Sequence, residues 1–210
     1  SLNAKNILSS QASEKRAQRA AEVLRSALRG LYRDDYLPVA DPASLVGLVL
    51  IVLVRRHVLH EQGLSRVVSE AAPCGFAGVL GNKGAVGLRF QLRERSVCFV
   101  AVHLPAGSDP TDAVARAAAL AETLGTLAAK FGRRNTGTPG PLGHDICVCL
   151  GDFNSRVGAP RDVADAAIRE RQFTALLACD ELTKRPAKGL REVAPIRFAP
   201  VRGSSTRPSA

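Results

Sequence analysis

The sequence lacks methionine and tryptophan entirely, and only 4% of its 210 residues are aromatic. Because a full-length natural product begins with methionine, we expect this chain to be a segment of a longer protein. The apolar run at residues 45–54 falls far below the roughly twenty residues that a transmembrane helix needs. Residues 1–10 lack the cationic and apolar regions of a signal peptide. With 46% hydrophobic residues, the chain is able to bury a core as one domain or most of a larger one.

Paired cysteine motifs are also absent, since the five cysteines form no CxxC pair and lie in apolar runs. An odd number of cysteines in such positions predicts reduced thiols and a cytoplasmic compartment. Cys147 and Cys149 alternate on one face of a predicted strand, which favours packing over metal binding. His57 and His60 have no neighbouring ligands to complete a metal site, so a solvated face explains them better.

The charge is strongly one-sided, with 29 basic and 19 acidic residues, a net charge of +10 and a pI of about 10.0. Such a balance indicates phosphate-rich partners: nucleic acid, anionic lipid headgroups or inositol phosphates. A solvated, arginine-rich surface is the alternative explanation.

Hydrophobic periodicity predicts alternating helices and strands. We expect an amphipathic helix at residues 10–30, a buried central strand at 45–54, a hairpin at 74–90, a strand at 96–103, and helices at 110–131 and 161–178. The first helix carries its apolar stripe on Ala17, Ala20, Leu24, Ala27, Leu28 and Leu31. Residues 32–44 are predicted to be a surface connection, and residues 55–72 are charged and loosely patterned.

The chain is organised around residues 145–156, where an apolar run stops at a cluster of polar residues. This pattern predicts a buried strand that delivers Asp152, Asn154 and Arg156 to its carboxyl end, where ligands of α/β proteins usually bind. A carboxylate, an amide and a guanidinium there are suited to act as a base, an orienting hydrogen bond and a phosphate contact. A strand followed by a purely structural Asx turn is the alternative.

Two further elements present polar residues in a similar way. The strand at 96–103 ends in His103, whose unperturbed pKa near neutrality suits acid or base chemistry. The predicted hairpin turn carries Asn82 and Lys83 between glycines, which would let a lysine approach a phosphate. Each residue alone is more simply structural, but several on one sheet edge make a shared site more plausible.

With these motifs in place, the chain resembles the inositol polyphosphate 5-phosphatase family. The resemblance rests on LVGLVLIVLVR at 45–55, GNKGAVGLRF at 81–90, VAVHLPAG at 100–107 and HDICVCLGDFNSRV at 144–157, in matching order and spacing. It covers nearly all of residues 1–200, which we interpret as a partial catalytic domain, and leaves residues 201–210 as a basic disordered tail or truncated end.

The resemblance implies a DNase I-like, four-layer α/β sandwich of two packed β-sheets with outer helices. It also implies Mg²⁺-dependent hydrolysis of the 5-phosphate of inositol polyphosphates or phosphoinositides. By motif position, Asp152 would activate the attacking water, Asn154 would hydrogen-bond the phosphoryl group, and His103 would donate to a nonbridging oxygen. These roles suit a reaction that depends on positioning water and stabilising charge.

The same resemblance places Lys83 and Asn82 near a phosphate of the head group, and has Arg156 support the site or contact substrate. The basic surface would favour peripheral contact with anionic membranes, and no nucleic-acid partner is expected.

The sequence departs from the family pattern in ways that bear on activity. The family's metal-binding glutamate is expected just upstream of Ser1, so no metal ligand is assigned within this sequence. Ser155 stands where the family usually has tyrosine, and Ala117 where it has asparagine. We therefore expect weak metal binding and impaired activity of this segment alone. A non-catalytic phosphoinositide-binding module and a nuclease of the same superfamily remain the alternatives.

Overall fold

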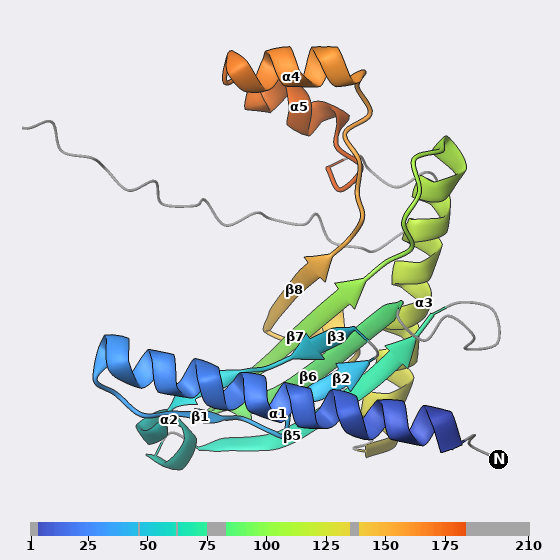
Figure 1. Cartoon of the computed structure of the whole chain (residues 1–210). Coiled ribbons are helices and arrows are strands. Elements are labelled where there is room, and N and C mark those ends of the chain that lie inside the picture. Colours follow the sequence, from blue (N-terminus) through green and yellow to red (C-terminus); the bar gives the residue numbers. More distant parts are fainter. Residues whose placement is uncertain (1–3, 46, 62, 75–82, 135–138, 184–210) are drawn as a thin grey trace, which may run out of the picture. The chain divides into compact units, whose positions relative to one another are not determined.

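A computed structural model describes residues 4–45, 47–61, 63–74, 83–134 and 139–183 (Figure 1). The helices are α1 (Ala4–Tyr32), α2 (Arg56–Glu61), α3 (Pro110–Arg134), the short 3-10 helix η2 (Pro141–Gly143), α4 (Arg161–Arg169) and α5 (Phe173–Cys179). The strands are β1 (Tyr36–Pro38), β2 (Ala43–Leu45), β3 (Leu48–Leu50), β4 (Leu53–Arg55), β5 (Leu64–Pro73), β6 (Gly84–Leu92), β7 (Arg95–His103) and β8 (Ile146–Asp152). The chain divides into two compact units, residues 1–156 and residues 157–210.

The first unit is built on a four-stranded sheet in the order β5-β6-β7-β8. Neighbouring strands are antiparallel except β7 and β8, which run parallel. Parallel neighbours need a long crossover, and α3 lies in the connection between them. The strand predicted at 96–103, the strand predicted to deliver Asp152 and the helix predicted at 110–131 are therefore confirmed.

Other elements lie on both faces of this sheet, which gives the first unit four layers (Figure 1). Helix α3 packs on one face, where Leu127 and Phe131 join a core with Cys98, Val100 and Val102. The two-stranded sheets β1-β4 and β2-β3 lie on the other face, over a second core that includes Val86, Leu88 and Phe90. Helix α1 in turn packs against β1 and β2. This order of helix, small sheets, large sheet and helix agrees with the predicted four-layer sandwich.

Strand β8 is not buried as predicted, because it forms an edge of the described sheet. Cys147 and Cys149 pack against the core under α3. On the opposite face, Ile146, Val148 and Leu150 are 39% to 50% exposed. The apolar run correctly indicated a strand, but the degree of burial depends on what covers it.

The start of β8 is anchored by Asp145, whose carboxylate accepts hydrogen bonds from the backbone N–H and the hydroxyl of Ser96 at 2.8 and 2.7 Å. These bonds and the nearby Arg95 guanidinium lower the pKa of Asp145 to about 2. An ionised side chain thus ties the first residues of β7 and β8 together.

The prediction of one buried central strand at 45–54 was wrong. The run folds as β2, β3 and β4, because the chain reverses between Leu45 and Leu48, which pair with each other. It then passes from the sheet β2-β3 to the sheet β1-β4. Within this run, Leu50 is buried whereas its neighbour Val49 is 41% exposed.

Two neighbouring expectations also need revision. The connection predicted at residues 32–44 contains β1 and part of β2, and residues 55–72 contain α2 and most of β5. The hairpin arms predicted within 74–90 are β5 and β6, which pair antiparallel up to Pro73 and Gly84. The first arm thus lies earlier than predicted, and Asn82 lies outside the described residues.

Helix α1 confirms the first predicted helix but buries a narrower stripe than its apolar pattern indicates. Ala17 and Ala21 are buried, whereas Ala20, Leu24, Ala27 and Leu31 are exposed. The small sheets beneath α1 cover only one line of the helix surface.

The second unit contains two short helices where one helix, 161–178, was predicted. The break falls at residues 170–172, and Arg171 has a left-handed φ of 56° that ends a helix. Ala167 is buried, whereas Val163, Phe173 and Leu177 are about half exposed. We expect the apolar residues of the helix predicted at 161–178 to pack against the fold; in this unit as described, Ala167 does so, whereas Val163, Phe173 and Leu177 do not.

The strand expected near residues 195–198 and the tail at 201–210 lie outside the described residues. Within the described ranges, no helix combines the length and apolar character required to span a bilayer.

Candidate active site

Three neighbouring strands bring the site together. Gly84 at the start of β6 pairs with His103 at the end of β7, and His103 pairs with Asp152 at the end of β8. Antiparallel pairing places the start of β6 beside the end of β7, and parallel pairing keeps the ends of β7 and β8 together. Residues from distant parts of the sequence therefore lie in one row.

His103 stands between a cation and an anion. Its Nε2 atom lies 2.5 Å from the Nζ atom of Lys83, which directly precedes β6. It lies 3.8 Å from the Oδ2 atom of Asp152. The second distance is too long for a direct hydrogen bond, so the carboxylate and the imidazole are close to each other without being bonded. The structure thus brings together the predicted Lys83, His103 and Asp152.

Asn154 has an uncommon backbone conformation that two hydrogen bonds stabilise. Its backbone has a left-handed φ of 51°, which asparagine tolerates better than most residues. Its backbone N–H donates to Oδ1 of Asp152 at 2.9 Å, and its side-chain nitrogen donates to the carbonyl of Leu104 at 2.8 Å. The Asx turn offered as the structural alternative is therefore present. A side-chain amide has two N–H groups, so the bond to Leu104 also orients the second one.

Two glycines permit the close approach of these strands. Gly151 has a φ of 118°, and a Cβ atom there would lie 2.2 Å from the carbonyl oxygen of Val102. Gly84 has a φ of 143°, and a Cβ atom there would lie 2.3 Å from the carbonyl oxygen of Ala72. Any larger residue at either position would push apart the strands that deliver Asp152 and Lys83.

Arg156 contacts the loop that follows β7. Its Nε atom donates to the carbonyl of Gly107 at 3.2 Å. The same carbonyl accepts a 3.0 Å hydrogen bond from Arg116, a buried residue of α3. Arg156 therefore supports the loop after His103.

Sequence reasoning missed Arg116. Its position in the sequence offered a signal that it is buried. It lies three residues after Ala113 and four before Leu120, and therefore on the same side of the predicted helix as these apolar residues. A charged residue on a buried stripe usually has a specific partner.

The described residues do not by themselves form a metal site. Among them, no group of three or more His, Cys, Asp or Glu side chains is arranged to hold a metal ion, at His57 and His60 or elsewhere. Ser1, just upstream of which the glutamate ligand is predicted, lies outside the described residues. Asp152 offers one carboxylate, and Lys83 places a cation near it. Mg²⁺ is usually held through one or two carboxylates together with water and phosphate oxygens, so Asp152 alone is an incomplete set.

The cysteines are free thiols, as predicted. Burial raises the pKa of the Cys74 thiol. A hydrogen bond with Cys147, together with burial, raises the pKa of Cys149. Thiols held protonated in this way are poor nucleophiles and poor metal ligands, so the chemistry of this region rests on Asp152, His103 and Lys83.

Comparison with known proteins identifies relatives across most of the chain. It is 29% identical to human synaptojanin-1 over 188 residues, which is 90% of this chain and 11% of the relative. It is 35% identical over 139 residues to type IV inositol polyphosphate 5-phosphatase 9 of Arabidopsis thaliana, covering 66% of this chain and 33% of the relative. The chain thus spans only a minor part of the curated relatives it matches.

Solved structures show the same relationship. The inositol polyphosphate 5-phosphatase domain of SPsynaptojanin, solved with inositol (1,4)-bisphosphate and calcium, matches with a TM-score of 0.63 and 25% identity. The match covers 76% of this chain and 44% of that one, and it confirms the predicted DNase I-like fold. A Cimex nitrophorin matches with a TM-score of 0.52 at only 12% identity, which shows the fold alone.

A family model described as Endonuclease/Exonuclease/phosphatase family 2 matches residues 1–202. The predicted resemblance to inositol polyphosphate 5-phosphatases is confirmed by these relatives. The row of Lys83, His103 and Asp152 therefore lies in a chain that belongs to the Endonuclease/Exonuclease/phosphatase family 2.

Proposed function

We propose that this site is the centre of a phosphatase that removes the 5-phosphate from inositol polyphosphates or phosphoinositides. The observation that carries the proposal is the convergence of Lys83, His103 and Asp152 at one end of three neighbouring strands. The similarity to inositol polyphosphate 5-phosphatases supports the substrate class.

The proposed reaction is attack of water on phosphorus, which breaks the bond between phosphorus and the inositol oxygen. The proton that water loses balances the proton that this oxygen gains as it leaves as a hydroxyl. Asp152 is exposed and its Oδ2 faces His103, so it is placed to orient the water and accept its proton. A phosphoryl oxygen bound beside Lys83 would take a charged hydrogen bond from Nζ in place of the present contact between Nζ and Nε2 of His103. With Nε2 released from that contact, a protonated imidazole would donate a second hydrogen bond to the phosphoryl group. Asn154 would donate its second amide hydrogen as charge develops on the phosphoryl oxygens.

The cofactor in this proposal is Mg²⁺, which neutralises phosphate charge and polarises the phosphoryl group. Because the described residues supply an incomplete ligand set, we expect this chain to bind Mg²⁺ only weakly. We further propose a cytoplasmic location, in which reduced cysteines persist.

Release of inorganic phosphate from an inositol polyphosphate tests the proposal. We expect release that requires Mg²⁺, stops with EDTA and falls at least about a hundredfold in Asp152→Asn, since general-base catalysis contributes roughly 10²–10⁴. Asp162→Asn, which removes a carboxylate from the exposed first turn of α4, is the matched control and should leave the rate unchanged.

Other outcomes point to the alternative functions. Binding of the inositol polyphosphate with no release at any Mg²⁺ concentration would contradict catalysis and indicate a binding module. Cleavage of plasmid DNA without phosphate release would indicate a nuclease.

A further inference from the structure

The outer face of α1 combines exposed basic and apolar side chains. Residues three or four apart lie on one line of a helix. One such line runs through Arg16, Ala20, Val23, Ala27 and Leu31, and every one of these residues is exposed. Val23 is 62% exposed and Leu31 is 74% exposed, so two large aliphatic side chains of this line face solvent.

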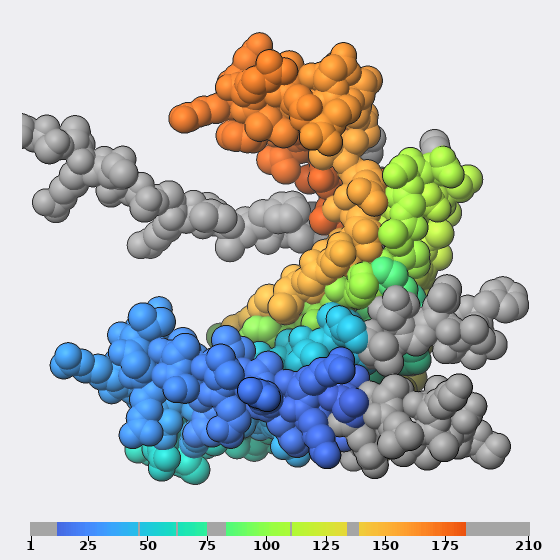
Figure 2. All heavy atoms as spheres, in the orientation of Figure 1, coloured from blue at the N-terminus to red at the C-terminus, as the bar shows by residue number. Residues whose placement is uncertain are grey.

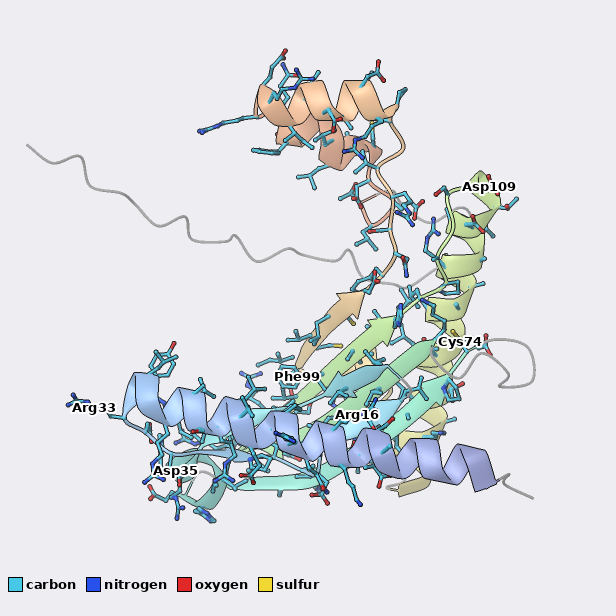
Figure 3. The ribbon with its side chains drawn as sticks, viewed as in Figure 1. Arg16, Arg33, Asp35, Cys74, Phe99 and Asp109 are labelled. Atoms are coloured by element: carbon cyan, nitrogen blue, oxygen red, sulfur yellow. The ribbon has the colours of Figure 1, made fainter. Side chains whose placement is uncertain are left out.

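This line lies beside the part of α1 that meets the fold. Ala17 and Ala21, slightly more than a quarter of a turn away around the helix, are buried where α1 packs against β1 and β2. Figure 2 shows α1 uncovered along the near face of the first unit. Figure 3 shows Arg16 on that near side of α1 and Arg33 reaching out from the end of the helix.

The charges along this face are mainly positive and uncompensated. Arg16, Arg19 and Arg33 are exposed, and within the described part of the chain none of the three has an ion-pair partner. Glu22, an acidic residue of the same helix, lies 3.8 Å from Arg25 and is partly neutralised by it. Free cations beside exposed aliphatic side chains are the pattern of a helix that lies in a membrane interface.

We infer that the face of α1 formed by Arg16, Arg19, Val23 and Leu31, together with Arg33 directly after the helix, docks on membranes rich in anionic lipid. The cations attract the lipid headgroups, and Val23 and Leu31 enter the boundary between headgroups and acyl chains. This goes beyond the proposed function, because the face lies on α1 and not on the strands that carry Asp152, and it holds whether the substrate is a lipid or a soluble inositol phosphate.

Membrane entry is testable because the chain contains no tryptophan. Leu31→Trp places one fluorescent reporter on the proposed face, and Val114→Trp places one on α3, at a position 71% exposed. With vesicles containing phosphatidylserine, we expect a blue shift and quenching by brominated lipid for L31W only. Vesicles of phosphatidylcholine alone should change neither spectrum.

Cosedimentation of the full chain with the same vesicles tests the charges. Each basic residue near an anionic surface strengthens partition by about fivefold, so Arg16→Gln, Arg19→Gln and Arg33→Gln together should weaken it on the order of a hundredfold. The matched control neutralises three exposed arginines elsewhere, Arg93, Arg133 and Arg171, and should retain wild-type partition.

Three results would overturn the inference. The first is an equal loss of vesicle partition in the two triple variants, and the second is an equal blue shift of L31W and V114W. The third is binding of a DNA duplex as tightly as vesicles, with loss of that binding in the variant that lacks Arg16, Arg19 and Arg33. Phosphate release from a soluble inositol polyphosphate is measured in parallel. It should be unchanged in both triple variants, so failure of the membrane site and failure of the proposed catalysis remain distinguishable.

Discussion

At the scale of single residues, the first unit contains a buried cluster of Arg89, Phe131 and His144. The Arg89 guanidinium carbon lies 5.8 Å from the centre of the Phe131 ring, whose centre is 6.5 Å from that of His144. Among the described residues, two nitrogens of Arg89 and both ring nitrogens of His144 are buried and have no hydrogen-bond partner. Such a cluster costs stability, because burial favours neutral or paired groups.

This cluster predicts that stability falls in mild acid. Burial, together with the charge of Arg89, lowers the pKa of His144 below its ordinary 6.5. The unfolded chain therefore takes up a proton on His144 at a higher pH than the folded chain does. Stability from this residue is complete above about pH 6.5 and declines as the pH falls towards the lowered value.

Urea unfolding at pH 7.5, 6.5 and 5.5 measures this effect. His144→Leu should remove part of the pH dependence and raise stability at pH 5.5, since it also removes two unsatisfied nitrogens. His60→Leu, at an exposed position of α2, is the control and should keep the wild-type profile. An unchanged profile in the His144 variant would refute the prediction.

At the scale of elements, β8 both carries Asp152 of the site and forms an edge of the sheet that the described residues build. It has no charged residue from Ile146 to Gly151, and its outer face exposes Ile146, Val148 and Leu150. Natural edge strands are normally protected by charges, prolines or bulges, and an exposed apolar edge promotes association between chains.

We therefore predict that Val148→Lys reduces self-association without unfolding the protein. A lysine on the exposed face of β8 opposes pairing with a second strand. Sedimentation velocity at rising protein concentration should show less association than in the wild type. Val163→Lys adds the same charge on α4, at a position 52% exposed, and should leave the association unchanged. Equal suppression by both variants would mean that net charge alone is responsible.

At the scale of the whole molecule, the two units differ in how much core they contain. Both core clusters lie within residues 1–156. In residues 157–210, Ala167 is the buried hydrophobic residue of the described part. Because burial of apolar surface is the main favourable contribution to folding, the first unit is expected to set the stability of the chain.

Removal of residues 157–210 tests this expectation. The remaining unit should unfold cooperatively, with a melting temperature within about 4 °C of that of the whole chain, which corresponds to roughly 1 kcal/mol or less. Thermal unfolding followed by circular dichroism measures the difference. A non-cooperative transition, or a larger fall in melting temperature, would show that the second unit contributes to the core.

The sequence by itself determined the elements whose signals are local. Apolar runs of strand length predicted β7 and β8, and a long apolar stripe predicted α3, because such periodicity reflects which side of a segment meets the core. The same patterns placed His103 and Asp152 at strand ends. They also carried the family resemblance, and with it the four-layer fold.

Only the tertiary structure decided which residues meet and which surfaces stay open. Pairing across β6, β7 and β8 placed Lys83, His103 and Asp152 in one row, and Arg116 of α3 reached the carbonyl of Gly107 in the loop after His103. The sequence also gave no indication that one face of β8, and the line of α1 through Arg16 and Leu31, would be exposed. Sheet register and layer coverage depend on contacts between segments far apart in the chain, which local periodicity does not encode.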